Sequence, residues 1–341
     1  MPVYSKFMEI SNLDLSAYLA SWKGVLSDIL ALRSQSSFVL TLACIFLAWL
    51  FAINLKRASF KKVVKSIFGL NKEAARDWSF WFFNECLLAP VYLTLKVGRG
   101  YFAYYTYTFL VFLGLPGLGV IENNEIGLFI SFLLVRIAMY DLTSYIVHYA
   151  FHYNEYLWQL HRVHHERTSL NFMASLRFHP LERVVSELLK IIIVGGGWGV
   201  VIFLGGGLSY PLTFALILVY GLFYLHSPLR HTEASIDFGV MDYIFTSPFM
   251  HQLHHCNDRR YKGKNLAPML SLWDWLFGTL ELPTKEWKEK GIEDGDIGIV
   301  GMDNIGDVTF KDFLWVPIVR MRGVWVRRRA LGKELLLDSQ K

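Results

Sequence analysis

The sequence predicts an all-α protein in which several membrane-spanning helices accompany a helical region rich in histidine. Hydrophobic residues make up 53% of the 341 residues and charged residues only 18%, and the mean hydropathy is +0.33. Such a composition is too apolar for a soluble domain of this length. All eleven histidines fall between His148 and His255. The chain therefore combines a polytopic membrane part with one chemically specialised segment.

Long stretches without a charged residue predict the membrane spans. Residues 34–55 form one such stretch of 22 residues, residues 101–121 one of 21, and residues 191–229 one of 39. A spanning helix needs about 20 apolar residues. Glycines and a proline interrupt the longest stretch at residues 205–211, so we expect two short spans there, joined by a turn. A further apolar helix begins near Ile126 and leads to His148. Buried helices of a large soluble protein are the alternative, but they are rarely so long and so apolar.

The positions of lysine and arginine predict the orientation of these spans, because cytosolic ends carry the basic residues. Five basic residues follow the first span within residues 56–65, and Lys96 and Arg99 precede the second. The connection at residues 116–125 contains no lysine or arginine and should face outward. With this orientation, every histidine cluster reaches the cytosolic face of the membrane.

The chain divides into four expected segments. Residues 1–37 form a polar surface segment that does not resemble a cleaved signal peptide, and residues 38–125 hold transmembrane and interfacial helices. Residues 126–283 carry the histidines, and residues 284–341 form a cytosolic or interfacial extension with a basic, aromatic helix. The net charge of +5 fits anionic lipid head groups better than nucleic acid in this apolar context. Three cysteines at unrelated spacings imply no disulfide framework.

The histidines form repeated clusters with helical spacing. Positions i, i+3 and i+4 share one face of a helix, so each tight cluster directs its imidazoles toward one point. Neutral imidazole is a good transition-metal ligand, and two metals with about five nitrogens each would use ten histidines. The expected ligands are His148 and His152, then His161, His164 and His165, then the looser pair His226 and His231, and finally His251, His254 and His255. His179 precedes a proline and stands alone, so we leave it out as a structural residue.

Local signals place the clusters on helices. His148 and His152 should close the helix that begins near Ile126, and the cluster that starts at His161 should open a helix after Trp158. The last cluster follows Ser247 and Pro248, which suggests a turn into a short helix. The glycine runs at 195–197 and 205–207 suggest close helix packing or, in the second case, a turn.

Two carboxylates are candidates for orienting the ligands. Asp141 lies seven residues before His148 on the same helix face, and a carboxylate near a bilayer is costly unless it has a function. It could accept the N–H of a ligating imidazole or pair with Arg136. Asp274 could support the site in the same way or cap a helix. Cys256 adjoins His255, and we interpret it as a bystander rather than a ligand.

The order of these clusters, followed by Asn265 and by the segment from Trp273 to Thr279, resembles the fatty acid hydroxylase superfamily. The resemblance covers roughly residues 126–283. It implies an integral-membrane, non-haem di-iron oxygenase with a cytosolic metal site, in which the ten histidines bind two iron ions and O2 is the co-substrate. Asn265 is among the residues that carry the resemblance, and we expect it to support the site together with Asp141 and Asp274. The segment from Leu229 to Thr232 looks most like bacterial members, which favours a bacterial inner membrane over the endoplasmic reticulum.

The resemblance also implies the partners and the reaction. The substrate would be a membrane lipid; we favour hydroxylation of one of its C–H bonds, with desaturation as the alternative. No haem-binding motif of a fused cytochrome b5 is present, so electrons would come from a separate protein of the ferredoxin, cytochrome b5 or reductase type. Zinc has no redox chemistry, which favours iron for this reaction.

Three alternatives remain open from the residues alone. A membrane zinc hydrolase would also use paired histidines, but Glu166 after His165 is not followed by a second histidine at the required spacing. A metal transporter would place its ligands near the bilayer midplane in broken helices, whereas these clusters lie at the ends of spans. A catalytically inactive relative is the third.

Overall fold

The computed structural model describes residues 72–115, 125–167, 170, 174–175, 177–205, 230–231, 235–293, 295–299 and 309–338. The expected N-terminal segment and first span lie outside these residues, as does the expected hairpin turn at residues 206–211. Within the described part the backbone is helical, and its β-type pairing is limited to one isolated bridge between Cys256 and Ile297. The expected all-α fold class is confirmed for this part of the chain.

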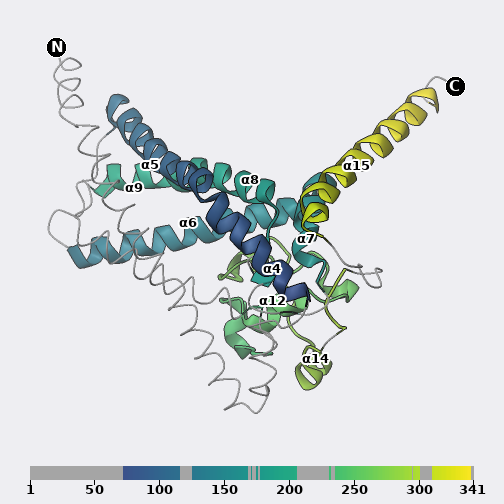
Figure 1. Ribbon diagram of the computed structural model, residues 1–341. Coiled ribbons are helices and arrows are strands. Elements are labelled where there is room, and N and C mark those ends of the chain that lie inside the picture. The colour runs from purple at the N-terminus through teal and green to yellow at the C-terminus, as the bar shows by residue number, and fades with distance from the viewer. Residues whose placement is uncertain are drawn as a thin grey trace. The chain divides into compact units, whose positions relative to one another are not determined.

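The helices fall into two compact units, which interleave along the sequence. The described residues of the first unit are 89–115, 125–143 and 186–205, and the second unit holds the rest. The elements are α4 (Lys72–Phe82), α5 (Ala89–Phe112), α6 (Glu125–Tyr153), α7 (Glu155–His165), α8 (Pro180–Lys190), α9 (Gly196–Gly205), α12 (Pro248–His254), α13 (Leu272–Leu276), α14 (Lys285–Lys290) and α15 (Phe310–Asp338), with short π-helical or 3₁₀ turns at Phe83–Leu87, Ile191–Gly195, Gly239–Tyr243 and Arg259–Tyr261 (Figure 1).

Helix α6 confirms the expected helix that carries His148 and His152 near its C-terminal end. The next helix differs from expectation, because the cluster at His161 closes α7 rather than opening it. The reason is Asn154, whose side-chain oxygen accepts hydrogen bonds from the backbone N–H groups of Tyr156 and Leu157 at 2.9 and 3.2 Å. This N-cap starts the helix one turn before Trp158.

Helix α12 forms where the sequence predicts it. Ser247 is its N-cap and accepts the backbone N–H of Met250 at 3.3 Å, while Pro248 occupies the first helical position, where no N–H is required. The segment from Trp273 to Thr279 is helical only in its first part, since α13 ends at Leu276.

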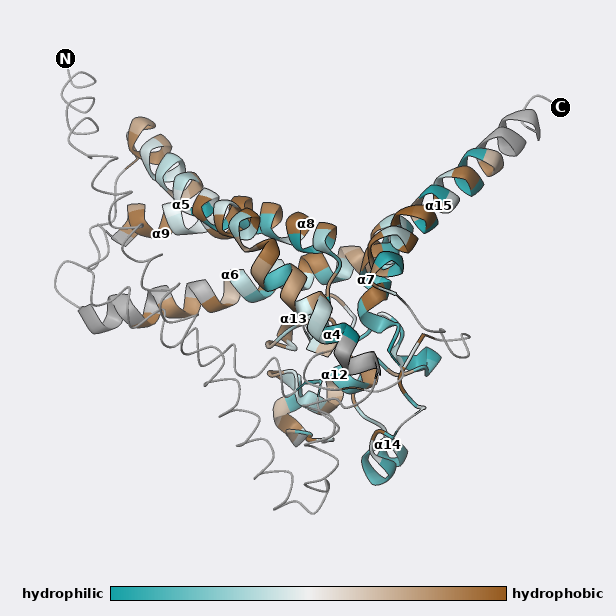
Figure 2. Ribbon diagram, in the orientation of Figure 1, coloured by the Kyte–Doolittle hydropathy of each residue, from teal (hydrophilic) through white to brown (hydrophobic). Residues whose placement is uncertain are grey.

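One continuous helical stretch of the described residues, Pro180–Leu204, is long and apolar enough to cross a membrane, with a mean hydropathy of 1.9 in its most apolar window. It comprises α8, a π-helical turn and most of α9. In Figure 2, α8 alternates hydrophilic and hydrophobic colours, while α14 in the second unit is mainly hydrophilic. The multi-pass arrangement expected from the sequence stays a prediction.

Glycines allow two helices of the first unit to approach closely. A Cβ atom built on Gly199 of α9 would lie 2.5 Å from the carbonyl oxygen of Ala103 in α5 and 2.5 Å from Cβ of Thr106. One on Gly195 would lie 2.8 Å from the carbonyl oxygen of Arg99. Small residues at this four-residue spacing permit backbone contact between helices, as the glycine run suggested.

Charged side chains in this unit are paired within it. The guanidinium of Arg99 binds the carboxylate of Glu187. The ammonium of Lys190 lies 3.3 Å from the hydroxyl of Tyr140 and 4.7 Å from the centre of its ring. Ionisable groups in apolar helices need such partners, so these contacts fix α8 against α5 and α6 inside the first unit.

In the second unit, α15 packs along α7, the helix of the central histidine cluster. Arg320 of α15 binds Glu166, the residue that follows His165, and Arg328 binds Glu155 at 3.2 Å. Phe80 of α4 stacks on Phe313 of α15 with ring centres 3.9 Å apart. These contacts place α7 between its neighbours and bury its C-terminal half.

The glycine contact predicts that Gly199→Ala destabilises the first unit. The added methyl group would overpack the α5–α9 contact, at a cost of about 1–3 kcal/mol, and thermal unfolding of the purified protein in detergent measures this. Gly323→Ala in α15 is the matched control, because a Cβ there meets no described atom within 4 Å. An unchanged melting temperature for Gly199→Ala would contradict the close contact.

Candidate metal centre

The structure gathers nine of the ten predicted ligands into two groups, both inside the second unit. The first group holds five histidines and the second holds four, and in each group the candidate ligand atoms all lie within 4.8 Å of one another. Members of the five-histidine group are His148, His152, His161, His165 and His254; members of the four-histidine group are His164, His231, His251 and His255. The tenth predicted ligand, His226, lies outside the described residues.

Helix geometry explains why one cluster serves both groups. On α7, His161 and His165 are four residues apart and join the five-histidine group, whereas His164 lies beside them and joins the other. The cluster on α12 divides in the same way, with His254 in the first group and His251 and His255 in the second. Histidines of α7 and α12 therefore contribute to both groups, and each group is a candidate position for one metal ion.

Within each group the Nε2 atoms converge on one another. In the five-histidine group, Nε2 of His161 lies 3.0 Å from Nε2 of His148 and 3.3 Å from Nε2 of His165. In the four-histidine group, Nε2 of His251 lies 3.1 Å from Nε2 of His231 and 3.2 Å from Nε2 of His255. Lone pairs that face each other at this distance repel unless a cation or proton lies between them, so the donor set fits a bound metal ion.

Burial favours the uncharged form of several of these imidazoles. It lowers the pKa values of His164, His165, His251 and His255 well below their usual range, and the neighbouring histidines and, for His251, Arg230 lower them further. Burial likewise lowers the pKa of His254 to about 3. An unprotonated nitrogen can bind a metal, and Nε2 of His254 is buried with no hydrogen-bond partner among the described residues.

The outward-facing nitrogens of the five-histidine group are held by three fixed acceptors. Nδ1 of His148 lies 2.6 Å from the carbonyl oxygen of Leu266, and Nδ1 of His254 lies 2.7 Å from that of Lys264. Nδ1 of His161 lies 2.7 Å from a carboxylate oxygen of Glu182. An N–H donated from Nδ1 leaves Nε2 as the free donor atom, so these contacts set the tautomer needed for binding.

Two of these acceptors flank Asn265, which shows what this predicted site residue does. Its backbone is in the left-handed region with φ of +54°, which asparagine tolerates better than most residues. The side-chain amide donates to the carbonyl oxygens of Glu281 at 2.8 Å and Met250 at 3.3 Å, and its oxygen accepts the backbone N–H of Glu281 at 2.9 Å. Asn265 thus positions the two neighbouring carbonyl groups rather than contacting an imidazole.

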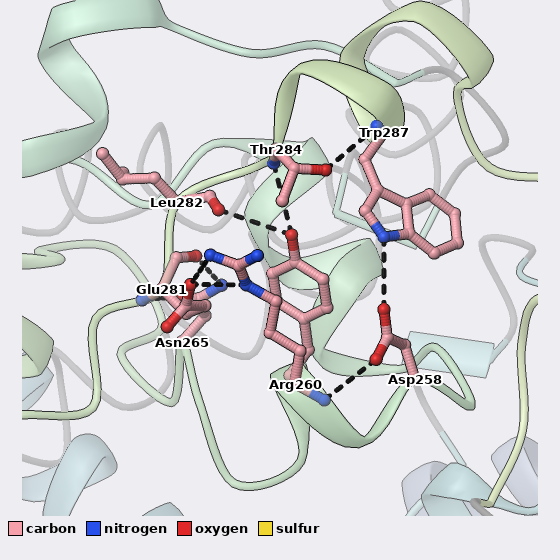
Figure 3. A network of polar contacts seen from close by, with 8 residues as sticks. Asp258, Arg260, Asn265, Glu281, Leu282, Thr284 and Trp287 are labelled. Carbon is pink, nitrogen blue, oxygen red and sulfur yellow. Dashed lines mark hydrogen bonds and ion pairs between the residues drawn. The ribbon is translucent and has the colours of Figure 1, made fainter.

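Figure 3 shows the polar network that holds this loop. Arg260 binds the carboxylate of Glu281 at 2.8 Å, and Asp258 accepts the indole N–H of Trp287 at 3.4 Å. Thr284 caps α14 by accepting the backbone N–H of Trp287 at 3.2 Å. The segment that follows the last histidine cluster is therefore tied to the segment that precedes and begins α14.

Asp274 also binds this loop, through hydrogen bonds from the loop's backbone. One of its carboxylate oxygens accepts the backbone N–H of Leu266 at 2.7 Å and the hydroxyl of Thr279 at 2.6 Å, and the other accepts the backbone N–H of Ala267 at 2.9 Å. Burial raises the pKa of Asp274, while these three donors oppose that shift. The described hydrogen bonds of Asp274 include none to a histidine. Its link to the site is Leu266, whose N–H binds Asp274 and whose carbonyl oxygen contacts His148.

The remaining candidates are members of neither group. Asp141 is buried on α6 in the first unit, and its predicted contact with an imidazole stays a prediction. His179 lies 3.2 Å through Nε2 from the carbonyl oxygen of Leu314, and its Nδ1 accepts the backbone N–H of Leu181. Cys256 lies in an apolar cluster with Phe249 and is in neither group, and burial raises the pKa of its thiol to about 12.

Sequence reasoning missed Glu182 and the two carbonyl groups. Glu182 is 21 residues from His161 and lies on a different helix, so no local spacing connects them. Carbonyl groups have no sequence signature at all. The only available signal was an asparagine among turn-forming residues after the last histidine cluster.

The fold and the site define an all-helical protein with a double cluster of buried, uncharged imidazoles. Comparison with known proteins agrees with this class, because residues 133–279 match the family model described as Fatty acid hydroxylase. This part of the chain is similar to the fatty acid hydroxylase family, and the match confirms the resemblance seen in the sequence.

Individual relatives match over part of their length. The ornithine lipid hydroxylase OlsE of Rhizobium tropici is 26% identical over 214 residues, which cover 61% of this chain and 56% of OlsE. Alkylglycerol monooxygenases of Homo sapiens and Danio rerio are 28% and 29% identical over 141 and 143 residues, which cover 41% of this chain and 28% of each relative. The chain therefore spans about half of the first relative and about a quarter of the others. No solved structure matches it significantly.

The loop contacts predict that Asp274→Asn weakens both the fold and metal retention. Replacing the carboxylate leaves buried N–H groups of Leu266 and Ala267 with a poorer acceptor, at a cost of about 1–3 kcal/mol, and frees the carbonyl that holds His148. Thermal unfolding and metal content of the purified protein measure the two effects. Asp312→Asn, at an exposed cap of α15, is the control; equal effects from both variants would contradict the proposed role.

The lowered histidine pKa values predict a pH-dependent stability of the metal-free protein. Unfolded histidines take up protons below pH of about 6.5, whereas the buried ones stay unprotonated, so unfolding takes up protons and becomes easier as pH falls. Each such histidine contributes about 1.4 kcal/mol per pH unit between the two pKa values. Melting curves of chelator-treated protein at pH above and below this value test it, and a constant melting temperature would contradict it.

Proposed function

We propose that this protein is an integral-membrane, iron-dependent oxygenase that hydroxylates a lipid. The observation that carries the proposal is the pair of imidazole groups, buried and uncharged, within the part of the chain that matches the fatty acid hydroxylase family. Each group offers several neutral nitrogen donors within 4.8 Å of one another. Such a donor set suits a divalent transition metal.

The proposed ligands are the nine gathered histidines together with His226. The five-histidine group would hold one iron ion, and the four-histidine group with His226 would hold the second. When bound, the two ions would supply the redox chemistry that activates O2, which zinc cannot do. Support for two separate positions comes from the alternation of the α7 and α12 histidines between the groups.

The residues of the chain would bind, orient and shield the metals. Leu266, Lys264 and Glu182 hold the outward nitrogens of three ligands, so the inward nitrogens stay aimed at one point. Burial of the clusters excludes bulk water, which protects a reactive oxidant from side reactions. We assign Asn265 and Asp274 as residues that position the loop between the α12 histidines and α13.

A membrane lipid is the proposed substrate. The matched relatives are an ornithine lipid hydroxylase and alkylglycerol monooxygenases, and both names describe oxygen insertion into amphiphilic molecules. The apolar stretch Pro180–Leu204 and the charge-free stretches of the sequence support membrane integration. We propose a multi-pass arrangement in a bacterial inner membrane with the histidine groups on the cytosolic side, and the lysine and arginine pattern supports this orientation.

Hydroxylation consumes two electrons in addition to those of the C–H bond, so an electron donor is required. We propose a separate protein of the ferredoxin, cytochrome b5 or reductase type. Among the described residues the metal-ligand clusters are the two histidine groups, and neither resembles a haem or iron–sulfur site.

The proposal predicts a lipid product that carries one added oxygen atom. Cells that express the protein should accumulate a lipid heavier by one oxygen, and the added mass should follow isotopically labelled O2. Expression of His161→Ala should abolish this product, because it removes a ligand. The control is His179→Gln, since His179 lies outside both groups and glutamine keeps a hydrogen-bonding side chain.

The outcome decides between related reactions. A lipid lighter by two hydrogen atoms would show desaturation and overturn the proposed hydroxylation. Release of a head group or acyl chain, without uptake of oxygen, would instead indicate a hydrolase. Unchanged product from His161→Ala in folded protein would remove the histidine groups from the reaction.

A further inference from the structure

The two histidine groups differ in the hydrogen-bond partners of their Nδ1 atoms. In the five-histidine group, one imidazole is backed by a carboxylate: Nδ1 of His161 lies 2.7 Å from Oε1 of Glu182. The side chains are only 3% and 8% exposed, so water does not weaken this contact. Two further members, His148 and His254, are backed by carbonyl oxygens.

The position of Glu182 on its helix holds its carboxylate beside His161. It lies in the first turn of α8, which begins at Pro180, and the amino end of a helix favours an anion. The neighbouring Arg183 binds a different carboxylate, that of Glu85, at 2.5 Å. Oε2 of Glu182 is buried and has no hydrogen-bond partner within the described ranges, so the described hydrogen bond of this carboxylate is the one to His161.

Two members of the four-histidine group have different surroundings at Nδ1. The Nδ1 atoms of His164 and His251 are buried without a hydrogen-bond partner in the part of the chain that the structure describes. His164 instead stacks on the ring of Phe178, with ring centres 4.7 Å apart. An aromatic ring that stacks on an imidazole does not accept a hydrogen bond from its N–H group.

A carboxylate that accepts the N–H of a ligand imidazole makes the other nitrogen a stronger donor and fixes the ring, and removing such a partner typically costs about 10–100-fold in metal affinity. We infer that Glu182 acts through His161 as a positioning residue and makes the five-histidine group the tighter of the two metal positions. The inference rests on the proposed function only in requiring that both groups bind metal. It follows that the five-histidine group binds metal first as metal is added and loses it last as metal is removed.

Zinc titration of the metal-free protein tests this without any need for catalysis. The full chain in detergent is stripped of metal and titrated with Zn²⁺ in competition with a chromophoric chelator. Wild-type protein should show two unequal dissociation constants. Glu182→Gln should weaken the tighter one by about 10–100-fold and change the weaker one less than about twofold.

The matched control is Glu85→Gln, which removes the carboxylate bound to Arg183, next to Glu182 in α8. It should leave both constants unchanged. A second background, His255→Ala, disables the four-histidine group and leaves one constant, which should then show the full effect of Glu182→Gln. Equal weakening of both constants, or no weakening of either, would overturn the inference.

Two further outcomes are decisive. If Glu182→Gln does not fold, Glu182→Asp serves instead: it retains the charge at a longer reach, and should weaken the tighter constant by a smaller factor, whereas an unchanged constant would overturn the inference. If the wild-type protein bound a single ion, the two-metal part of the proposed function would fail. If that one constant depended on Glu182, the result would support the positioning role of Glu182 at the five-histidine group, and independence from Glu182 would refute that role.

Discussion

The structure depends on holding uncharged imidazole nitrogens 3.0–3.3 Å apart inside a buried site. Protonation would relieve the crowding of lone pairs, but burial lowers the pKa of His254 to about 3 and those of its neighbours well below their usual range. The cluster is therefore poised to accept a cation other than a proton. In the metal-free protein its repulsion must be offset by the surrounding contacts.

Two of those contacts come from a short loop and a third comes from Glu182 of α8, and none comes from the helices that carry the histidines. Lys264 and Leu266 present their carbonyls to two imidazoles of one group, and Asn265 between them adopts the left-handed conformation that turns both carbonyls to the site. Asp274 fixes the loop through backbone N–H groups. Asn265 and Asp274, which the sequence suggested as direct partners of the ligands, thus bind backbone groups of the loop, and the loop carbonyls contact the imidazoles.

The sequence predicted what depends on local spacing. Helices α6 and α12 follow from an apolar run and from the Ser247–Pro248 cap, and the i, i+3, i+4 pattern predicted that the clusters converge. Asn154 was a local signal for the start of α7 that the histidine pattern obscured. Glu182 could not be predicted, because its contact with His161 depends on how α8 packs on α7. The division into two groups likewise depends on packing between helices.

We propose that the two histidine groups form a two-iron centre. The most direct measurement is the iron and zinc content per chain of protein purified from cells grown with ample iron, for the wild type and for variants that lose one ligand of each group, such as His161→Ala and His255→Ala. We expect two iron ions per wild-type chain and a loss of bound iron in each variant. Zinc alone in the wild type, or iron content that is insensitive to both substitutions, would contradict it.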